Sequence, residues 1–330
     1  EISATRPIAT VGLTHGLSLV ADLFAEAGRT VVVPQPFWGN YRQIFAVRTG
    51  ASFVEAVCFP DGARFDPRCF EKAFEPEDAT PALVFLNFPS NPGGWSPPAR
   101  ERAELVESLV RMAERRPLVV VADDAYFGLV HEPDVPRDSI FGDLARAHPN
   151  LAAIAVDGAT KELGFFGARV GFLTLALPPD SAAAEIFERK IAHLIRATSG
   201  PPSDLSQRAV LAALRGSETE REVADVQRLL AARYRALRSA LATLDPALLR
   251  PLPSNAGCFA EVEIPIELNL SAEEVRRHLV RHEGVGLIAT GPRSLRIAHC
   301  SVAESALPEL VARLARGVSA LRAAGVTENV

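Results

Sequence analysis

A lysine and an arginine eight positions apart carry the strongest chemical signal in this sequence: Lys161 and Arg169, in the glycine-rich segment 157–171. An aldehyde cofactor needs an amine with which it can form a Schiff base, and a phosphorylated one also needs a fixed cation at its other end. A lone lysine is most often a solvated surface charge. Here the apolar neighbours Phe165 and Phe166 would desolvate the amine and favour its nucleophilic form.

Three further segments place polar groups where apolar runs begin or end. Residues 11–16 stand at the start of a predicted helix. The first N–H groups of this helix, together with the hydroxyl of Thr14, could bind an anion, or the segment could be an ordinary N-cap. The segment lacks the spacing of a loop that binds a nucleoside triphosphate. Residues 87–94, with two prolines and two glycines, predict a turn. Asp123 ends an apolar run, where it could be a helix N-cap or a buried counter-ion to a cationic ligand. A magnesium site is not indicated, because no motif supplies further carboxylates beside it.

The elements that must position these groups alternate between strands and helices. Continuous apolar strands are typical of a parallel sheet covered by helices on both faces. Ligands of such sheets bind beyond the carboxyl ends of the strands, where Asp123 and Lys161 fall. The pattern predicts strands at 30–34, 82–87, 118–123, 151–157 and 170–175, and helices at about 15–27, 97–115 and 181–196.

A second region begins near residue 219 and has a different pattern of predicted helices and strands. Its first part, 219–243, has the charged, amphipathic pattern of a long connecting helix. Strands at 259–264, 286–288 and 295–299, a helix at 271–283 and a terminal helix follow. We therefore predict a large α/β domain over 1–218 and a smaller α+β domain over 219–330.

Composition indicates a small-molecule partner or none. With 35 Lys+Arg against 40 Asp+Glu the net charge is -5, which gives no basic surface for nucleic acid. No signal peptide or membrane-length apolar stretch is visible, so we expect a cytoplasmic protein with no membrane partner. Neither a methionine nor a helical segment precedes Val11 and Gly12, so we expect further sequence upstream. The cysteines form no CxxC pair, which predicts free thiols in a reducing compartment at Cys58, Cys69, Cys258 and Cys300.

Two histidines raise the question of a metal. His278 and His282 are four residues apart on a predicted helix, at a spacing that zinc sites use. However, Leu279 stands where the HExxH motif has glutamate, and no third ligand is near in the sequence. We therefore predict a solvated helix face and no metal site.

Taken together, these segments resemble the fold-type I pyridoxal-phosphate enzymes, specifically the class I/II aminotransferases. The resemblance extends from about residue 11 to 315. It implies a large α/β domain with a mostly parallel, seven-stranded type of sheet flanked by helices, a smaller α+β C-terminal domain, and a homodimer with its active site at the subunit interface. The order of motifs that carries it is the loop at 11–16, an aromatic residue after proline at Trp38, Asn-Pro-x-Gly from Asn91, Asp-x-x-Tyr from Asp123, Thr-Lys with arginine eight residues later, and a late Arg296.

The resemblance implies pyridoxal 5'-phosphate as cofactor and assigns roles around its ring. Lys161 would form the Schiff base and then transfer protons as general acid and base. Asp123 would pair with the pyridine nitrogen, and Asn91 and Tyr126 would donate hydrogen bonds to the phenolic oxygen. Trp38 would stack on the ring.

Other residues would bind the phosphate and the substrate. Arg169 is implied as the phosphate cation, with Thr14, Thr160 and the backbone of Gly12 and Leu13. Arg296 would bind the substrate α-carboxylate through a bidentate pair. Asn91 and Tyr41 would also line the substrate side.

Two positions depart from the family pattern. Gly93 stands where threonine is usual, and Gly158 stands three residues before the lysine, where serine or threonine is common. Both departures predict fewer or reorganised phosphate contacts. The activity implied is transfer of an amino group between an amino acid and a 2-oxo acid. The alternatives are a pyridoxal-phosphate-dependent β-lyase or decarboxylase of the same fold, and a non-catalytic effector-binding domain of a transcription regulator.

Overall fold

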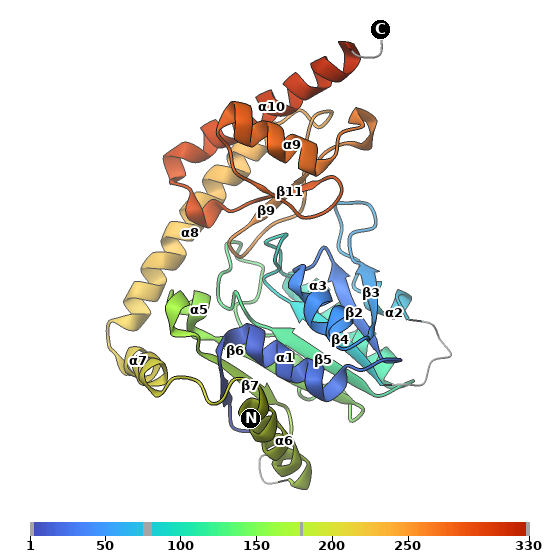
Figure 1. Cartoon of the computed structure of the whole chain (residues 1–330), viewed down its shortest axis with the longest axis vertical. Helices are drawn as coiled ribbons and strands as arrows, with labels where there is room; N and C mark the ends of the chain where they lie inside the picture. The colour runs from blue at the N-terminus through green and yellow to red at the C-terminus, as the bar shows by residue number, and fades with distance from the viewer. Residues whose placement is uncertain (1–2, 75–80, 179–180, 328–330) are drawn as a thin grey trace. The chain divides into compact units, whose positions relative to one another are not determined.

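The computed structural model of the chain describes residues 3–74, 81–178 and 181–327 (Figure 1). The backbone divides into two compact units. The first comprises Glu1–Pro89, Pro97–Leu129 and Pro133–Val223, and the second comprises Ser90–Ser96, Val130–Glu132 and Ala224–Val330. Two short stretches from the first 132 residues thus belong to the second unit.

The first unit is built on a seven-stranded sheet in the order β1-β7-β6-β5-β4-β2-β3. The strands from β3 to β6 are parallel, whereas β7 is antiparallel to both of its neighbours. All of β4 is buried, in agreement with its uninterrupted apolar sequence. The prediction of an α/β fold with a mostly parallel sheet is confirmed. The strands are β1 (Ile8–Thr10), β2 (Thr30–Gln35), β3 (Ser52–Val57), β4 (Ala82–Asn87), β5 (Leu118–Asp123), β6 (Leu151–Gly158) and β7 (Gly171–Leu175).

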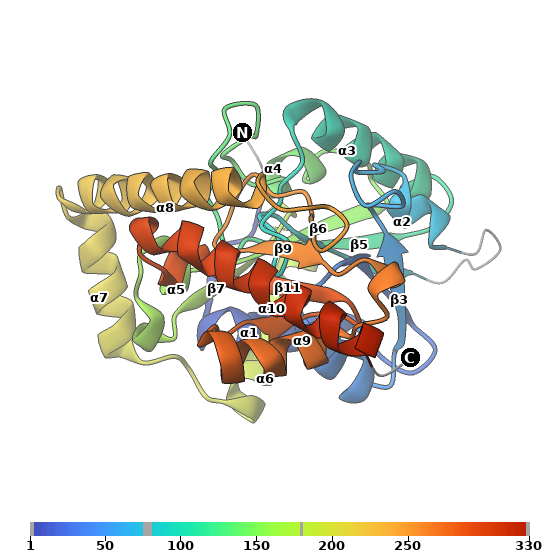
Figure 2. The same ribbon diagram turned by 90° about the horizontal axis from the view of Figure 1, so that it is seen from above.

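Helices cover both faces of this sheet. Figure 2 shows α1 and α6 on one side of the strands and α3 and α4 on the other. Leu17 and Val20 of α1 and Ile191 of α6 join the same apolar core as the strands, because each helix presents one apolar stripe. The helices of the unit are α1 (Gly12–Phe24), η1 (Arg42–Val47), α2 (Cys69–Lys72), α3 (Ala99–Ala113), α4 (Phe141–Leu144), α5 (Ala159–Glu162), η2 (Phe166–Ala168), α6 (Ala182–Thr198) and α7 (Asp204–Arg215).

The second unit contains an antiparallel sheet of four strands in the order β10-β11-β9-β8. One face of it packs on α9 and α10, which lie side by side (Figure 2). The strands are β8 (Arg250–Pro251), β9 (Ala260–Glu263), β10 (Ile288–Ala289) and β11 (Ser294–Ile297). The helices are α8 (Thr219–Leu241), which enters the unit at Ala224, η3 (Ile266–Leu268), α9 (Ala272–His278), η4 (Leu279–Glu283), η5 (His299–Ser301), η6 (Glu304–Ala306) and α10 (Leu307–Thr327).

Some elements differ from the sequence expectation. Helix α1 begins at Gly12, earlier than the predicted start at residue 15. The expected helix at 271–283 is α-helical only as far as His278, and a π-helical turn completes it. β3 and α7 were not predicted, because β3 is a half-exposed edge strand and α7 buries only Val210, which leaves little apolar periodicity to detect. Among the described helices, none combines the length and apolar character needed to span a bilayer.

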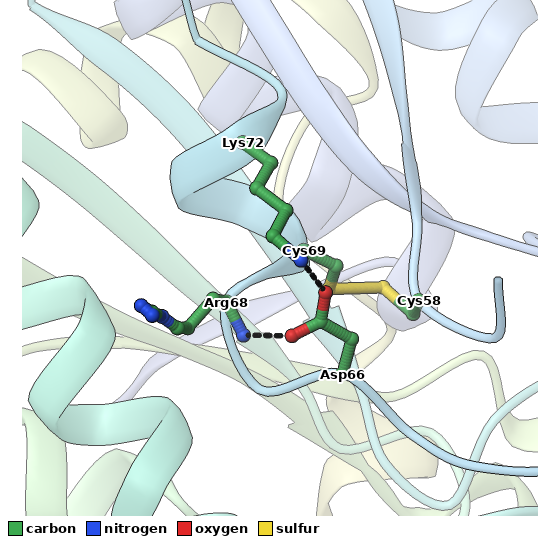
Figure 3. The surroundings of a disulfide bond; sticks show 5 residues. All are labelled: Cys58, Asp66, Arg68, Cys69 and Lys72. Carbon is green, nitrogen blue, oxygen red and sulfur yellow. Dashed lines mark hydrogen bonds and ion pairs between the residues drawn. A yellow bond between two sulfur atoms is a disulfide. The ribbon is translucent and has the colours of Figure 1, made fainter.

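The prediction of four free thiols is wrong. Cys58 follows β3, Cys69 begins α2, and the intervening turn brings their Cα atoms to 5.0 Å, where the sulfur atoms are joined in a disulfide (Figure 3). Asp66 stabilises the same turn by accepting hydrogen bonds from the N–H of Arg68 and the amine of Lys72. Cys258 and Cys300 take no part in this bond. The argument from thiols for a reducing compartment therefore no longer applies.

Thiol titration checks this correction. We expect two reactive thiols in the denatured, unreduced protein and four after reduction, because Cys58 and Cys69 are bonded to each other. The bond closes a loop across a sequence separation of 11. By loop-closure entropy, its loss in a Cys69→Ser variant should lower the free energy of unfolding by about 3 kcal/mol. Four reactive thiols before reduction would contradict the disulfide.

Candidate functional site

Asp123, the last residue of β5, is buried with 3% of its surface exposed. Its Oδ1 accepts a hydrogen bond from the N–H of Ala125 at 3.1 Å, and its Oδ2 accepts one from the hydroxyl of Tyr41. Burial raises the pKa of Asp123, and the hydrogen bonds from Tyr41 and Ala125 and the charge of Lys161 offset part of this effect. A buried carboxylate of this kind is stabilised in its ionised form by a cationic partner.

Tyr41 has a different position from the one expected. The sequence placed it on the substrate side, but its side chain is fully buried and its hydroxyl donates to Asp123. Its ring packs against those of Phe45 and Phe85, and Trp38 meets it edge-on with ring centroids 5.6 Å apart. Burial, and then the charge of Asp123, raise the pKa of Tyr41 well above its ordinary value. The hydroxyl therefore remains a donor throughout the physiological range.

Lys161 lies in α5, a single helical turn that follows β6 directly. Because β5 and β6 are adjacent parallel strands, their carboxyl ends bring Lys161 and Asp123 to the same edge of the sheet. The Nζ of Lys161 lies 5.3 Å from the ring centroid of Tyr126, which is buried three residues after Asp123. The predicted lysine, acid and tyrosine thus lie at one sheet edge, in the first unit.

The N-terminus of α1 and the guanidinium of Arg169 lie against each other. A β-carbon at Gly12 would stand 2.6 Å from Nη2 of Arg169, and Gly12 has a φ of +74°, so glycine is required for this approach. The first N–H groups of a helix have no partners within the helix, and Val11 provides no side-chain cap. Thr14 and Arg169 are exposed. A helix start beside a cation is a site for a phosphate group.

The departure at Gly158 has a steric cause. A β-carbon there would lie 2.6 Å from the carbonyl oxygen of Val170 and 3.0 Å from Cδ1 of Leu13, so serine or threonine has no room. Thr160, two residues later, is 4% exposed, and its Oγ1 has no hydrogen-bond partner within the described part of the chain. A phosphate oxygen would satisfy such a buried hydroxyl.

The second unit holds the remaining predicted residues around Arg296 on β11. Its Nη1 donates a hydrogen bond to Oδ1 of Asn91 at 2.8 Å, and its guanidinium lies over the ring of Phe259, 4.3 Å from the centroid. Asn91 belongs to the stretch Ser90–Ser96 that packs within this unit. The predicted site residues therefore form two clusters, one in each unit.

The residues of the first unit fit pyridoxal phosphate. The uncapped helix start, the guanidinium of Arg169 and the orphaned hydroxyl of Thr160 suit a phosphate. The buried Asp123 suits a protonated pyridine nitrogen. The amine of Lys161 at the same sheet edge suits an aldehyde.

Sequence reasoning missed one positioning residue, Asn87. It is the last residue of β4, directly opposite Asp123 in the parallel register, and its Nδ2 donates to the Asp123 carbonyl oxygen at 2.9 Å. An asparagine at the end of an otherwise apolar strand was the available signal. Because prolines and glycines follow it, Asn87 was interpreted only as the first residue of a turn.

Known proteins share both the sequence pattern and the fold. The chain is 27% identical over 229 residues to an aspartate/prephenate aminotransferase of Thermus thermophilus, covering 69% of this chain and 54% of that protein. It is 27% identical over 329 residues to a 2-aminoadipate transaminase of the same species, covering 95% and 75%. The chain thus spans about half of the first relative's length and three quarters of the second's.

Two solved structures have the same fold. An aminotransferase from Anaerococcus prevotii matches with a TM-score of 0.79 at 24% identity, covering 96% of this chain and 75% of that one. An α-aminoadipate aminotransferase from Thermus thermophilus, in complex with N-(5'-phosphopyridoxyl)-L-leucine, matches with a TM-score of 0.78 at 25% identity, covering 96% and 77%. In addition, residues 2–314 match the family model described as aminotransferase class I and II. The chain belongs to the class I and II aminotransferase family.

Proposed function

We propose that this protein is a pyridoxal-phosphate-dependent aminotransferase that moves an amino group between an amino acid and a 2-oxo acid. The observation that carries the proposal is the buried Asp123 at the same sheet edge as Lys161. Lys161 is also the best candidate for the Schiff base among the three lysines of the chain. Lys72 is paired with Asp66, and Lys190 is exposed on α6.

When bound, the cofactor would supply an electron sink for the negative charge that develops at the substrate Cα. Asp123 would keep the ring nitrogen protonated, and Tyr41 and Asn87 would hold Asp123 in place. Lys161 would remove the proton from Cα and return it as general acid and base. Tyr126 and Asn91 would donate to the phenolic oxygen, and Trp38 would stack on the ring.

The remaining roles concern binding. We assign the phosphate to Arg169, Thr14, Thr160 and the backbone of Gly12 and Leu13, which are supported by the helix start and the orphaned hydroxyl described above. Arg296 would bind the substrate α-carboxylate, since its guanidinium presents a planar set of donors. The large domain over 1–218 and the small domain over 219–330, like the cytoplasmic location, remain predictions.

A homodimer with its active site at the subunit interface is part of the proposal. Several large apolar side chains of the first unit are exposed to solvent. Phe166 in η2 is 61% exposed, and Leu205 and Leu214 in α7 are 78% and 60% exposed. Exposed apolar side chains on neighbouring elements are typical of association surfaces.

A panel of amino donors tested with 2-oxoglutarate and pyruvate checks the activity. The panel should include aspartate and 2-aminoadipate, which occur in the names of the two relatives. We expect at least one pair to give a new amino acid and a new 2-oxo acid in equal amounts. Release of ammonia or carbon dioxide without amino-acid product would instead indicate a β-lyase or a decarboxylase. No bound cofactor and no turnover would contradict the proposal and favour a non-catalytic binding domain.

A further inference from the structure

A buried carboxyl group lies beside Arg296 on the small sheet of the second unit. Glu261 on β9 is directly opposite Arg296 on β11 in the antiparallel register, so the two side chains project from the same face of the sheet. Glu261 is only 1% exposed. Acidic side chains are rarely buried to this extent unless a partner compensates for the loss of water. The other face of these strands is apolar and packs on α9 and α10 through Ala260, Val262, Leu295 and Ile297.

Within the described part of the chain, Glu261 and Arg296 each retain one buried polar atom that lacks a hydrogen-bond partner. Oε1 of Glu261 accepts a hydrogen bond from the hydroxyl of Thr290, but Oε2 is buried and has no hydrogen-bond partner in the described part of the chain. The same holds for Nε of Arg296, although its Nη1 donates to Asn91. Buried polar atoms in folded proteins are nearly always satisfied, so the Nε of Arg296 can donate to a bound carboxylate, whereas the Oε2 of Glu261 can donate to one only when its carboxyl group is protonated.

We propose that Glu261 is a positioning residue for Arg296 whose carboxyl group controls how strongly the guanidinium binds a substrate carboxylate. The inference rests on the proposed function, since it takes Arg296 as the carboxylate-binding residue. An ionised Glu261 offsets the positive charge of Arg296 and repels an incoming carboxylate. A neutral Glu261 leaves the whole guanidinium charge available.

The other charged side chains that the described strands of this sheet place on the same face are paired. Glu263, two residues along β9, is 3.1 Å from Arg293, and Arg250 of β8 is 3.6 Å from Glu267. The residues of β10, Ile288 and Ala289, carry no charge.

The titration of Glu261 gives this arrangement a pH dependence. Burial raises the pKa of Glu261 to about 7, although Thr290 and Arg296 act in the opposite direction. At pH 6 the carboxyl group is therefore mostly neutral, and at pH 8.5 it is ionised. The affinity for a substrate carboxylate should accordingly fall as the pH rises through 7.

A Glu261→Gln variant tests the proposal, because glutamine keeps the size and the acceptor for Thr290 but removes the charge. The KM for the best 2-oxo acid of the panel is measured at pH 6 and pH 8.5, together with its dissociation constant by calorimetry. At pH 8.5 the variant should bind about tenfold more tightly than the unmodified protein. At pH 6 the two should agree, with kcat unchanged.

Glu263→Gln is the matched control, because it removes a paired carboxylate from the same strand and the same face. It should follow the unmodified protein at both pH values. A second variant, Thr290→Val, removes a hydrogen bond that lowers the pKa of Glu261, so the rise in KM should move to higher pH. If Glu261→Gln folds poorly, the pH profile of Thr290→Val still tests the role of Glu261.

Two outcomes would overturn the inference. One is parallel pH profiles for the unmodified protein and Glu261→Gln. The other is tighter binding by Glu261→Gln at pH 6 and pH 8.5 alike. Complete absence of turnover in the unmodified protein would instead contradict the proposed function, and the calorimetric comparison would still report on Glu261.

Discussion

Replacing Lys161 with methionine is expected to lower the rate of amino transfer by about 10⁴-fold or more, because one side chain both binds the cofactor covalently and transfers the proton at Cα. Methionine has a similar length but no amine, so α5 and its packing should be preserved. The variant should therefore keep the thermal stability of the unmodified protein. The loss should appear in kcat rather than in the KM for the substrates.

The site of covalent attachment can be mapped with little ambiguity. The chain has only three lysines, at positions 72, 161 and 190, so borohydride reduction followed by peptide mass spectrometry has three possible outcomes for a lysine adduct. We expect the adduct on Lys161 alone. Lys190→Met, at an exposed position of α6, is the matched control and should retain full activity and labelling. An adduct on Lys72 or Lys190, or an active Lys161→Met protein, would refute the assignment.

Replacing Asp123 with asparagine is expected to lower kcat by about 10³-fold while leaving cofactor affinity within about tenfold. The Oδ1 of asparagine can still accept the hydrogen bond from the N–H of Ala125, and the hydroxyl of Tyr41 can turn to accept one from the Nδ2 that replaces the second oxygen, so the end of β5 should keep its geometry. What is lost is the negative charge that keeps the ring nitrogen protonated. Parallel measurements of kcat and of cofactor dissociation separate these two effects, and an equal loss in both would argue for a structural role.

Tyr41→Phe provides a graded comparison for the same group. Removal of its hydroxyl deletes one of the two hydrogen bonds to the Asp123 carboxylate, and we expect a decrease in kcat of about tenfold. The effect should vanish in the Asp123→Asn background, because Tyr41 acts through that charge. Tyr234→Phe, which removes a buried hydroxyl bonded to Ser254 and Glu132 in the second unit, should leave kcat unchanged. Additive losses in the double variant would show that Tyr41 acts independently of Asp123.

The sequence by itself determined the type of fold and the order of the chemical groups. Apolar runs such as 82–87 and 118–123 are long and uninterrupted, and they became β4 and β5 with the predicted bounds. A residue at the end of such a run lies at the carboxyl edge of a parallel sheet wherever the strand is placed. This is why Asp123 and Lys161 could be assigned to one edge from local pattern alone, and why the family resemblance was visible.

Only the tertiary structure decided which groups meet across large separations in sequence. Tyr41 reaches Asp123 across 82 residues, and Arg296 reaches Asn91 across 205. The crowding that excludes a side chain at Gly158 comes from Val170 and Leu13, and the bond between Cys58 and Cys69 depends on a turn with no CxxC spacing. In the sequence, Glu261 is one of several charged residues in a short strand, and only the register between strands shows that it lies opposite Arg296.

These contacts share one physical cause. They depend on strand order, on the register between strands and on the path of the connections, all of which are set by how the whole core packs. Local periodicity indicates only which side of an element is buried. It therefore identified the buried strands, but not the residues that bond to Asp123 and Arg296 or those that crowd Gly158.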